Sequence, residues 1–124
     1  MSMLLAQHGQ CALKDITVGT ERTTREIGGK QEWNVSFVNT CKCPQQNLIV
    51  SCDDFHTLEK VDPNVFKPIG NNQCLVNGGL PIEAFAKVGF LYAWDPPFIF
   101  VPRSSQPEKN PILHCSSSSV STIS

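Results

Sequence analysis

The stretch NTCKCPQQNLIVSC, residues 39–52, holds three of the six cysteines of this 124-residue chain and decides how the rest of the sequence is interpreted. Its second half alternates, so that Leu48, Val50 and Cys52 fall on one face of an extended strand. If the preceding strand keeps its phase, the two earlier cysteines share that core-facing parity. We therefore expect all three thiols to point into the interior.

Two kinds of cysteine site compete for this stretch. Cys41, Cys43 and Cys52 with His56 have the ligand types of a tetrahedral zinc site, but zinc ligands usually pair as C-x(2-4)-C, and C-x-C within a strand is extended. Disulfides use every cysteine and are typical of a small secreted domain. We therefore predict disulfides and no metal, with the pairing left open. The predicted disulfide cysteines are Cys11, Cys41, Cys43, Cys52, Cys74 and Cys115.

The apolar pattern has a period of two along most of the chain, which indicates half-buried strands. The expected strands are 15–18, 33–38, 47–52, 74–76, 82–94 and 98–101. Gly28-Gly29 supplies the positive φ angles of a tight turn, so the first two strands are expected to form a hairpin. Asp62 with Pro63 predicts a single helical turn.

Short strands, many Gly and Pro turns and no long helical period predict an all-β fold, a small disulfide-stapled antiparallel β-sandwich. Residues 1–10 are expected to be a disordered N-terminal remnant without a clear signal peptide. Residues 11–102 are expected to form a single domain, and residues 103–124 a polar, Ser-rich tail that carries Cys115.

Charge and hydropathy exclude several classes of function. Ten Lys and Arg against eleven Asp and Glu give a net charge of -1, which leaves no basic excess for binding nucleic acid. No apolar run approaches the length that crosses a bilayer, so no membrane span is expected. Six cysteines favour an extracellular protein even though the first ten residues lack a basic leader and an apolar core of a signal peptide.

Catalysis is not supported by the sequence. Ser51, Asp53, Asp54 and His56 have the residue types of a nucleophile, acids and a base, but catalytic groups usually come from separate elements and acids commonly populate turns. Neither paired glycine is followed by a helix and a phosphate-binding lysine. We expect no enzyme activity and no cofactor.

Two further signals favour an extracellular binding protein. Asn34-Val35-Ser36 is a glycosylation sequon, and the strand phase puts Asn34 on the face opposite Trp33. Four aromatic residues from three of the expected strands could form a flat platform for sugar rings, although aromatic residues that alternate along a strand more often belong to the core. A cell-wall carbohydrate-binding module that binds polysaccharide is therefore one alternative function. The platform residues are Trp33, Tyr92, Trp94 and Phe98.

An ordered set of motifs resembles the plant tapetum determinant family of small secreted cysteine-rich proteins. The motifs are Cys11 followed by Asp15-Ile16-Thr17-Val18, then VSFVNTCKC, NLIVSCDDF, VDPNVF, CLVNGGLPI and FLYAWDPPF. The similarity runs from about Cys11 to Val101. It implies a secreted ligand that binds the leucine-rich-repeat ectodomain of a receptor-like kinase and directs anther and tapetum cell fate.

A ligand of this kind presents a rigid surface, and loops on a rigid scaffold commonly carry recognition. The irregular loop 53–70 and the corner 95–98 are the expected contact regions. The candidate receptor-contact residues are Phe55, Phe66, Asp95 and Phe98. For each aromatic residue the alternative is that the ring plugs the core beneath its loop.

Overall fold

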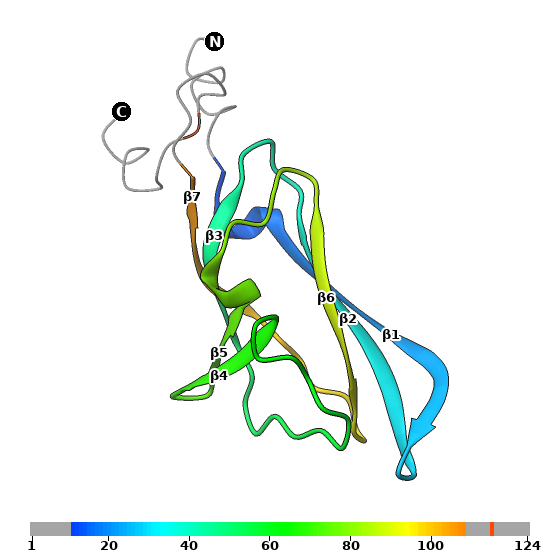
Figure 1. Ribbon diagram of the computed structural model, residues 1–124. Helices are drawn as coiled ribbons and strands as arrows, with labels where there is room; N and C mark the ends of the chain where they lie inside the picture. Colours follow the sequence, from blue (N-terminus) through cyan, green and yellow to red (C-terminus); the bar gives the residue numbers. More distant parts are fainter. Residues whose placement is uncertain (1–10, 109–114, 116–124) are drawn as a thin grey trace.

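The computed structural model describes residues 11–108 and Cys115, and they form two antiparallel sheets that face each other (Figure 1). Sheet A contains β1 (Ile16–Ile27), β2 (Lys30–Asn39) and β6 (Lys87–Ala93), in the order β1-β2-β6. Sheet B contains β3 (Gln45–Ser51), β4 (Phe66–Gly70), β5 (Gln73–Val76) and β7 (Pro102–Pro107), in the order β4-β5-β3-β7. Two short 3-10 helices, η1 (Leu13–Asp15) and η2 (Asn77–Gly79), complete the fold. The predicted all-β, disulfide-rich class is confirmed.

The β1–β2 hairpin follows from the predicted turn and alternation. Gly28 and Gly29 have φ angles of 58° and 84°, a region that glycine enters without steric cost. Val35 and Phe37 of β2 are fully buried, whereas Asn34 between them and the turn is exposed. β1 is longer than predicted, because residues 19–27 continue the strand, which has a register shift between Arg22 and Glu26. That bulge carries Thr23 to Arg25 out of the ladder.

Aromatic rings from both sheets make the centre of the core. The Phe66 ring of sheet B lies 4.3 Å from the Phe90 ring and 6.0 Å from the Phe37 ring of sheet A, measured between centroids. Both contacts are stacked, a favoured arrangement for aromatic pairs. Phe100 closes the same cluster edge-on against Phe66. Each buried ring contributes roughly 1.5–3 kcal/mol by removal from water.

Two expected elements differ from the structure, and one strand, β4, is additional to those expected. The strand predicted over 82–94 is interrupted, because Ile82 forms only an isolated bridge with Gln45 and Phe85 has a φ of 60°, so β6 begins at Lys87. The expected helical turn is a tight turn in which Asp62 Oδ1 accepts a hydrogen bond from the backbone N–H of Asn64 at 2.9 Å. β4 was not expected because it contains Pro68. As an edge strand of sheet B, β4 tolerates a residue without an N–H.

The last strand lies further along the chain than predicted. Residues 97–101 are extended but outside any ladder, and β7 pairs with β3 instead. β7 therefore adds residues 103–107 to the domain that we expected to end at 102. The predicted N-terminal remnant 1–10 lies outside the described residues. So do residues 109–114 and 116–124 of the predicted tail.

The cysteines form three disulfides, and two of them start from the same turn. Cys11 pairs with Cys41, and Cys43 pairs with Cys115, so both ends of the described chain are linked to the three-residue Cys-Lys-Cys turn. The third bridge, Cys52–Cys74, joins β3 to β5 within sheet B. Closing loops of 22 to 72 residues removes unfolded-state entropy worth about 3–4 kcal/mol per bridge in the chain-entropy model.

Asn39, which is fully buried, holds the Cys-Lys-Cys turn in place. Its Nδ2 donates to the carbonyl oxygens of Cys43 at 2.8 Å and Ile82 at 3.0 Å. Its Oδ1 accepts from the backbone N–H of Cys41 at 3.1 Å and from Gln45 Nε2 at 3.3 Å. A buried amide with its partners satisfied fixes one local geometry. The turn is therefore specified by hydrogen bonds as well as by its two disulfides.

The described residues contain no helix whose length and hydropathy would let it span a bilayer.

The disulfide pairing is testable because trypsin cuts after Lys42, between the two cysteines of the turn. Digestion of the oxidised protein is expected to give one two-peptide cluster and one three-peptide cluster, each dissolved by reduction. The two-peptide cluster joins 1–14 to 31–42, and the three-peptide cluster joins 43–60 to 61–87 and 110–124. Mass spectrometry before and after reduction reads this out. A product that links 1–14 to 43–60 contradicts the pairing.

Candidate functional site

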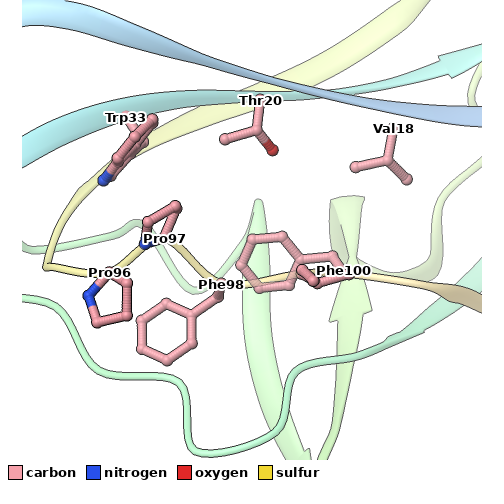
Figure 2. Close-up of a pocket in the computed structure, with 8 residues that line it drawn as sticks. Val18, Thr20, Trp33, Pro96, Pro97, Phe98 and Phe100 are labelled. Carbon is pink, nitrogen blue, oxygen red and sulfur yellow. The ribbon is translucent and has the colours of Figure 1, made fainter.

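An apolar groove lies along the open side of the sandwich, where β1 is the edge strand of sheet A (Figure 2). Val18 and Thr20 of β1 and Trp33 of β2 form one wall. The extended segment Pro96 to Phe100 forms the other. The groove has a volume of about 460 Å³, within the range of small binding pockets, and it opens to solvent.

The segment 96–100 stands apart from both sheets because of its sequence. Pro96 and Pro97 have no N–H to donate to a neighbouring strand, and the Asp95–Pro96 peptide bond is cis. The chain therefore leaves β6 and crosses to sheet B without pairing. It rejoins the ladder only at β7, which pairs with β3. The gap between this segment and β1 is the groove.

Two side chains hold the proline-containing wall in position. The Phe98 backbone N–H donates to the Tyr92 hydroxyl at 2.8 Å, and the Val101 N–H donates to Ser51 Oγ at 3.0 Å. Burial raises the pKa of the Tyr92 hydroxyl, although the hydrogen bond from Phe98 opposes this effect. The hydroxyl is therefore neutral at physiological pH. Behind the wall, the Phe55 ring lies 5.3 Å from the Phe98 ring, edge-on.

The lining of the groove suits apolar contacts. Its residues include the Thr20 hydroxyl but no ionisable side chain, so the groove itself has no group for acid–base chemistry. Phe100 is nearly buried at 4% exposure, whereas Ile99 on the rim is 82% exposed. Ile99 thus continues the apolar lining of the groove onto the exposed surface.

The predicted sugar-binding platform does not form. Tyr92 is fully buried in the core, so it offers no face to a ligand. Lys30 Nζ lies 5.0 Å from the centroid of the Trp94 ring, and the His56 ring stacks on Trp94 at 5.5 Å. Trp33 is also engaged, because its Nε1 donates to the Trp94 carbonyl at 2.9 Å. The two tryptophans thus contact protein groups rather than forming a bare flat surface.

Several side chains of the other candidate clusters have different partners in the structure. The three cysteines that could bind zinc with His56 each have a different disulfide partner. His56 Nδ1 lies 2.6 Å from the Asp54 carbonyl oxygen, and Ser51 Oγ accepts from the backbone of Val101. Asp15 lies beside the Cys11–Cys41 bridge, where its Oδ2 accepts from the backbone N–H of Ala12 at 2.9 Å.

The four receptor-contact candidates occupy different environments. Phe66 is 2% exposed and belongs to the core, so it offers no surface to a partner. Phe55 is half-buried behind the groove wall, and Phe98 is half-buried in that wall. Asp95 is exposed at the corner, where its Oδ2 accepts from the Gln31 N–H at 3.4 Å. The glycosylation candidate Asn34 is exposed on the outer face of sheet A.

Two features, one on the groove rim and one at the hairpin end of sheet A, are not among the predictions from the sequence. Ile99 lies between Phe98 and Phe100 in the sequence. A period-two alternation that places both phenylalanines inside would have predicted an exposed Ile99. Glu32 and Glu59, which lie 27 positions apart in sequence, meet at the hairpin end of sheet A, and their carboxyl groups are within hydrogen-bond reach of each other. No local pattern marks such a pair.

Comparisons with known proteins give one consistent match. The family model described as "Tapetum determinant 1, C-terminal" matches residues 12–108. TPD1 protein homolog 1B of Oryza sativa subsp. japonica is 31% identical over 88 residues, which cover 70% of this chain and 52% of that protein. TPD1 protein homolog 1 of Arabidopsis thaliana is 31% identical over 85 residues, covering 67% and 48%. The chain thus spans about half the length of these relatives, and no solved structure matches it.

The hydrogen bond from Phe98 to Tyr92 makes the groove wall testable. Tyr92→Phe removes the acceptor, so we expect the free energy of unfolding to fall by about 1 kcal/mol and the Phe98 amide to exchange faster with solvent. Denaturant melts and hydrogen exchange measure both effects. Ser104→Ala, an exposed serine of neighbouring β7, is the control and should change stability by less than about 0.5 kcal/mol. Unaltered exchange at Phe98 in the Tyr92 variant would show that the bond does not hold the wall.

Proposed function

The chain belongs to the tapetum determinant family, and from that premise we propose that it is a secreted ligand for the leucine-rich-repeat ectodomain of a receptor-like kinase, acting in anther and tapetum cell-fate specification. The observation that carries the proposal is the family match over residues 12–108, which covers every strand from β1 to β7. The role is that of a binding protein without catalysis or cofactor. Extracellular localisation follows from the same proposal.

The disulfide framework supports an extracellular role. Structural disulfides persist in oxidising compartments and are rare in the reducing cytosol. All six cysteines are paired: two bridges start from the Cys-Lys-Cys turn, and the third joins β3 to β5. A ligand that is already rigid loses less conformational entropy when it docks, so more of its contact energy appears as affinity.

The groove and its rim are the proposed receptor-contact surface. Ile99 lies on the rim and is 82% exposed. Phe98 belongs to the same segment, and Asp95 immediately precedes it. In most protein interfaces a few anchor residues contribute most of the binding energy, and the contacts around them contribute little. Of the predicted candidates, Phe98 and Asp95 are proposed to contact the receptor directly, and Phe55 to support Phe98 from behind.

Binding to a panel of leucine-rich-repeat ectodomains tests the proposal. We expect the oxidised protein to bind one of them, and Ile99→Glu to weaken that binding at least tenfold, about 1.4 kcal/mol, because a carboxylate replaces the exposed apolar side chain. Surface plasmon resonance with each ectodomain immobilised measures the dissociation constants. No binding across a panel that includes the relevant receptor class would defeat the ligand hypothesis.

Phe85→Glu is the matched control for this experiment. Phe85 is 69% exposed, and its neighbour Ala86 accepts a hydrogen bond from the backbone of Asn39, which places it at the Cys-Lys-Cys end of the sandwich. We expect this variant to bind like the parent protein. If Phe85→Glu abolishes binding while Ile99→Glu does not, the receptor contacts the opposite end and the groove is the wrong surface.

We further propose that Asn34 carries an N-linked glycan when the chain passes through a secretory pathway. Asn34 is exposed in the middle strand of sheet A, opposite Leu91 and Glu21 in register, and its side chain points away from the core. Expression in secreting plant cells should give a product that loses one glycan mass on enzymatic deglycosylation. Asn34→Gln and Ser36→Ala should both lack it, whereas Ser36→Thr should keep it. An unmodified secreted product contradicts this assignment.

A further inference from the structure

The side chain of Glu32 is buried although its position on β2 faces outward. Its register partner on β6 is Ala93, and Asn34, two residues further along the same face, is exposed. Glu32 itself is 2% exposed. It is covered from one side by the β1 bulge, with Thr23 and Arg25, and from the other by Glu59 of the loop 52–65. Two irregular segments thus meet over one carboxyl group.

The contacts around Glu32 leave two oxygens without a partner. Thr23 Oγ1 donates to Glu32 Oε1 at 2.9 Å, and Arg25 Nε lies 3.3 Å from the same oxygen. Arg25 Nη2 lies 4.0 Å from Glu59 Oε2. Within the described part of the chain, Glu32 Oε2 and Glu59 Oε1 are buried and receive no hydrogen bond. The two carboxyl groups are nevertheless within hydrogen-bond reach of each other.

A proton between the two carboxyl groups resolves this arrangement. Two ionised carboxylates beside a single guanidinium leave one negative charge uncompensated at a buried position, which is costly. A carboxylic acid can donate to a carboxylate, so a proton on Glu59 gives both free oxygens a hydrogen bond and leaves Glu32 paired with Arg25. The cluster is then neutral.

We propose that Glu32 and Glu59 hold one proton between them, and that this proton fastens the loop 52–65 to the β1–β2 hairpin, so that the attachment of the loop depends on pH. Besides Arg25 and the stack of the His56 ring on Trp94, two hydrogen bonds between neutral groups hold this junction. The Leu58 N–H donates to the Ala93 carbonyl at 3.0 Å, and the Ala93 N–H donates to Thr57 Oγ1 at 3.0 Å. These two bonds involve no ionisable group, and the pH dependence that we propose comes from the carboxyl pair.

The electrostatics agree with the shared proton. Burial raises the pKa of Glu59, and the neighbouring Glu32 carboxylate raises it further. The pKa of Glu32 is lowered, because its hydrogen bonds to Glu59 and Thr23 and the charge of Arg25 outweigh its burial. The other charged or titratable side chains around the junction are exposed, except that of Lys30, which is half-buried over the Trp94 ring. They are Glu26 of β1, Lys30 of β2, His56 and Lys60 of the loop, and Asp95 after β6.

The directions of the two shifts define where the loop is held most firmly. The stabilisation from Glu59 is complete below the ordinary pKa of 4.5 and is lost as the pH rises through the raised pKa of this group. The stabilisation from Glu32 is present above 4.5 and is lost as the pH falls through its lowered pKa. The junction is therefore tightest in mild acid and loosens toward neutral and alkaline pH.

A loosened loop would also affect the groove, because Phe55 of the same loop packs behind Phe98. Affinity for the receptor should then fall as the pH rises. This consequence rests on the proposed function, whereas the shared proton does not, and the two are measured separately.

Hydrogen exchange of the free protein between pH 5 and pH 8 tests the shared proton. After correction for intrinsic exchange rates, protection of the Leu58 amide should fall as the pH rises, by up to about tenfold for each unit by which the pKa of Glu59 is raised. Glu59→Gln keeps a hydrogen-bond donor for Glu32 at every pH, so protection of the Leu58 amide in this variant should not change with pH. Glu83→Gln removes an exposed carboxylate outside the junction and should behave like the parent.

Carbon-13 titration of the glutamate carboxyls gives a second readout that does not depend on loop motion. One of the two residues should titrate above 4.5 and the other below it. The proposal is overturned if protection of Leu58 is flat in the parent protein, if Glu59→Gln keeps the parent's slope, or if both carboxyls titrate at the ordinary value. Receptor affinity at pH 5.5 and pH 7.5 is measured afterwards. A pH-independent affinity with the expected exchange result removes only the link to recognition.

Discussion

The turn at Cys41-Lys42-Cys43 is the constraint on which the rest of this molecule depends. Two disulfides leave it in different directions, one to the start of the described chain and one to Cys115. The buried amide of Asn39 holds its backbone and ties it to Ile82 and Gln45, so the turn also joins sheet A to sheet B. A chain of this size has a modest core, and covalent links at a single point remove the freedom of both ends together.

With one end of the sandwich closed in this way, the other end carries the irregular features. The β1–β2 turn, the loop 52–65 and the corner at Pro96-Pro97 all lie at the end opposite the Cys-Lys-Cys turn (Figure 1). Two of them depart from regular pairing for a clear reason: positive φ at Gly28 and Gly29, and two prolines without an N–H. The disulfide-linked turn and these irregular segments, which include part of the proposed receptor-contact surface, thus lie at opposite ends of one small fold.

The sequence predicted well what depends on alternation and little that depends on contacts between distant residues. The hairpin, the core faces of β2 and β3 and the disulfide-rich all-β class follow from period two and from paired glycines. The strand break at Phe85 and the shift of the last strand to Pro102–Pro107 do not, because apolar alternation continues through segments that never pair. Phe66 illustrates the same limit at the site. A phenylalanine in a predicted loop has the same local pattern whether it faces solvent or, as here, stacks on Phe90 in the core.

Because Cys11 and Cys115 are both linked to one turn, the two ends of the described domain lie at the same pole of the fold. Any chain that continues from either end leaves from the same pole, and a force applied through both ends is borne by the turn and its two bridges before it reaches either sheet. Attachment of the protein to a surface by its amino or its carboxyl end therefore presents the same opposite pole to the solution. A longer precursor or an engineered fusion can carry bulky partners on both ends and still leave the groove accessible.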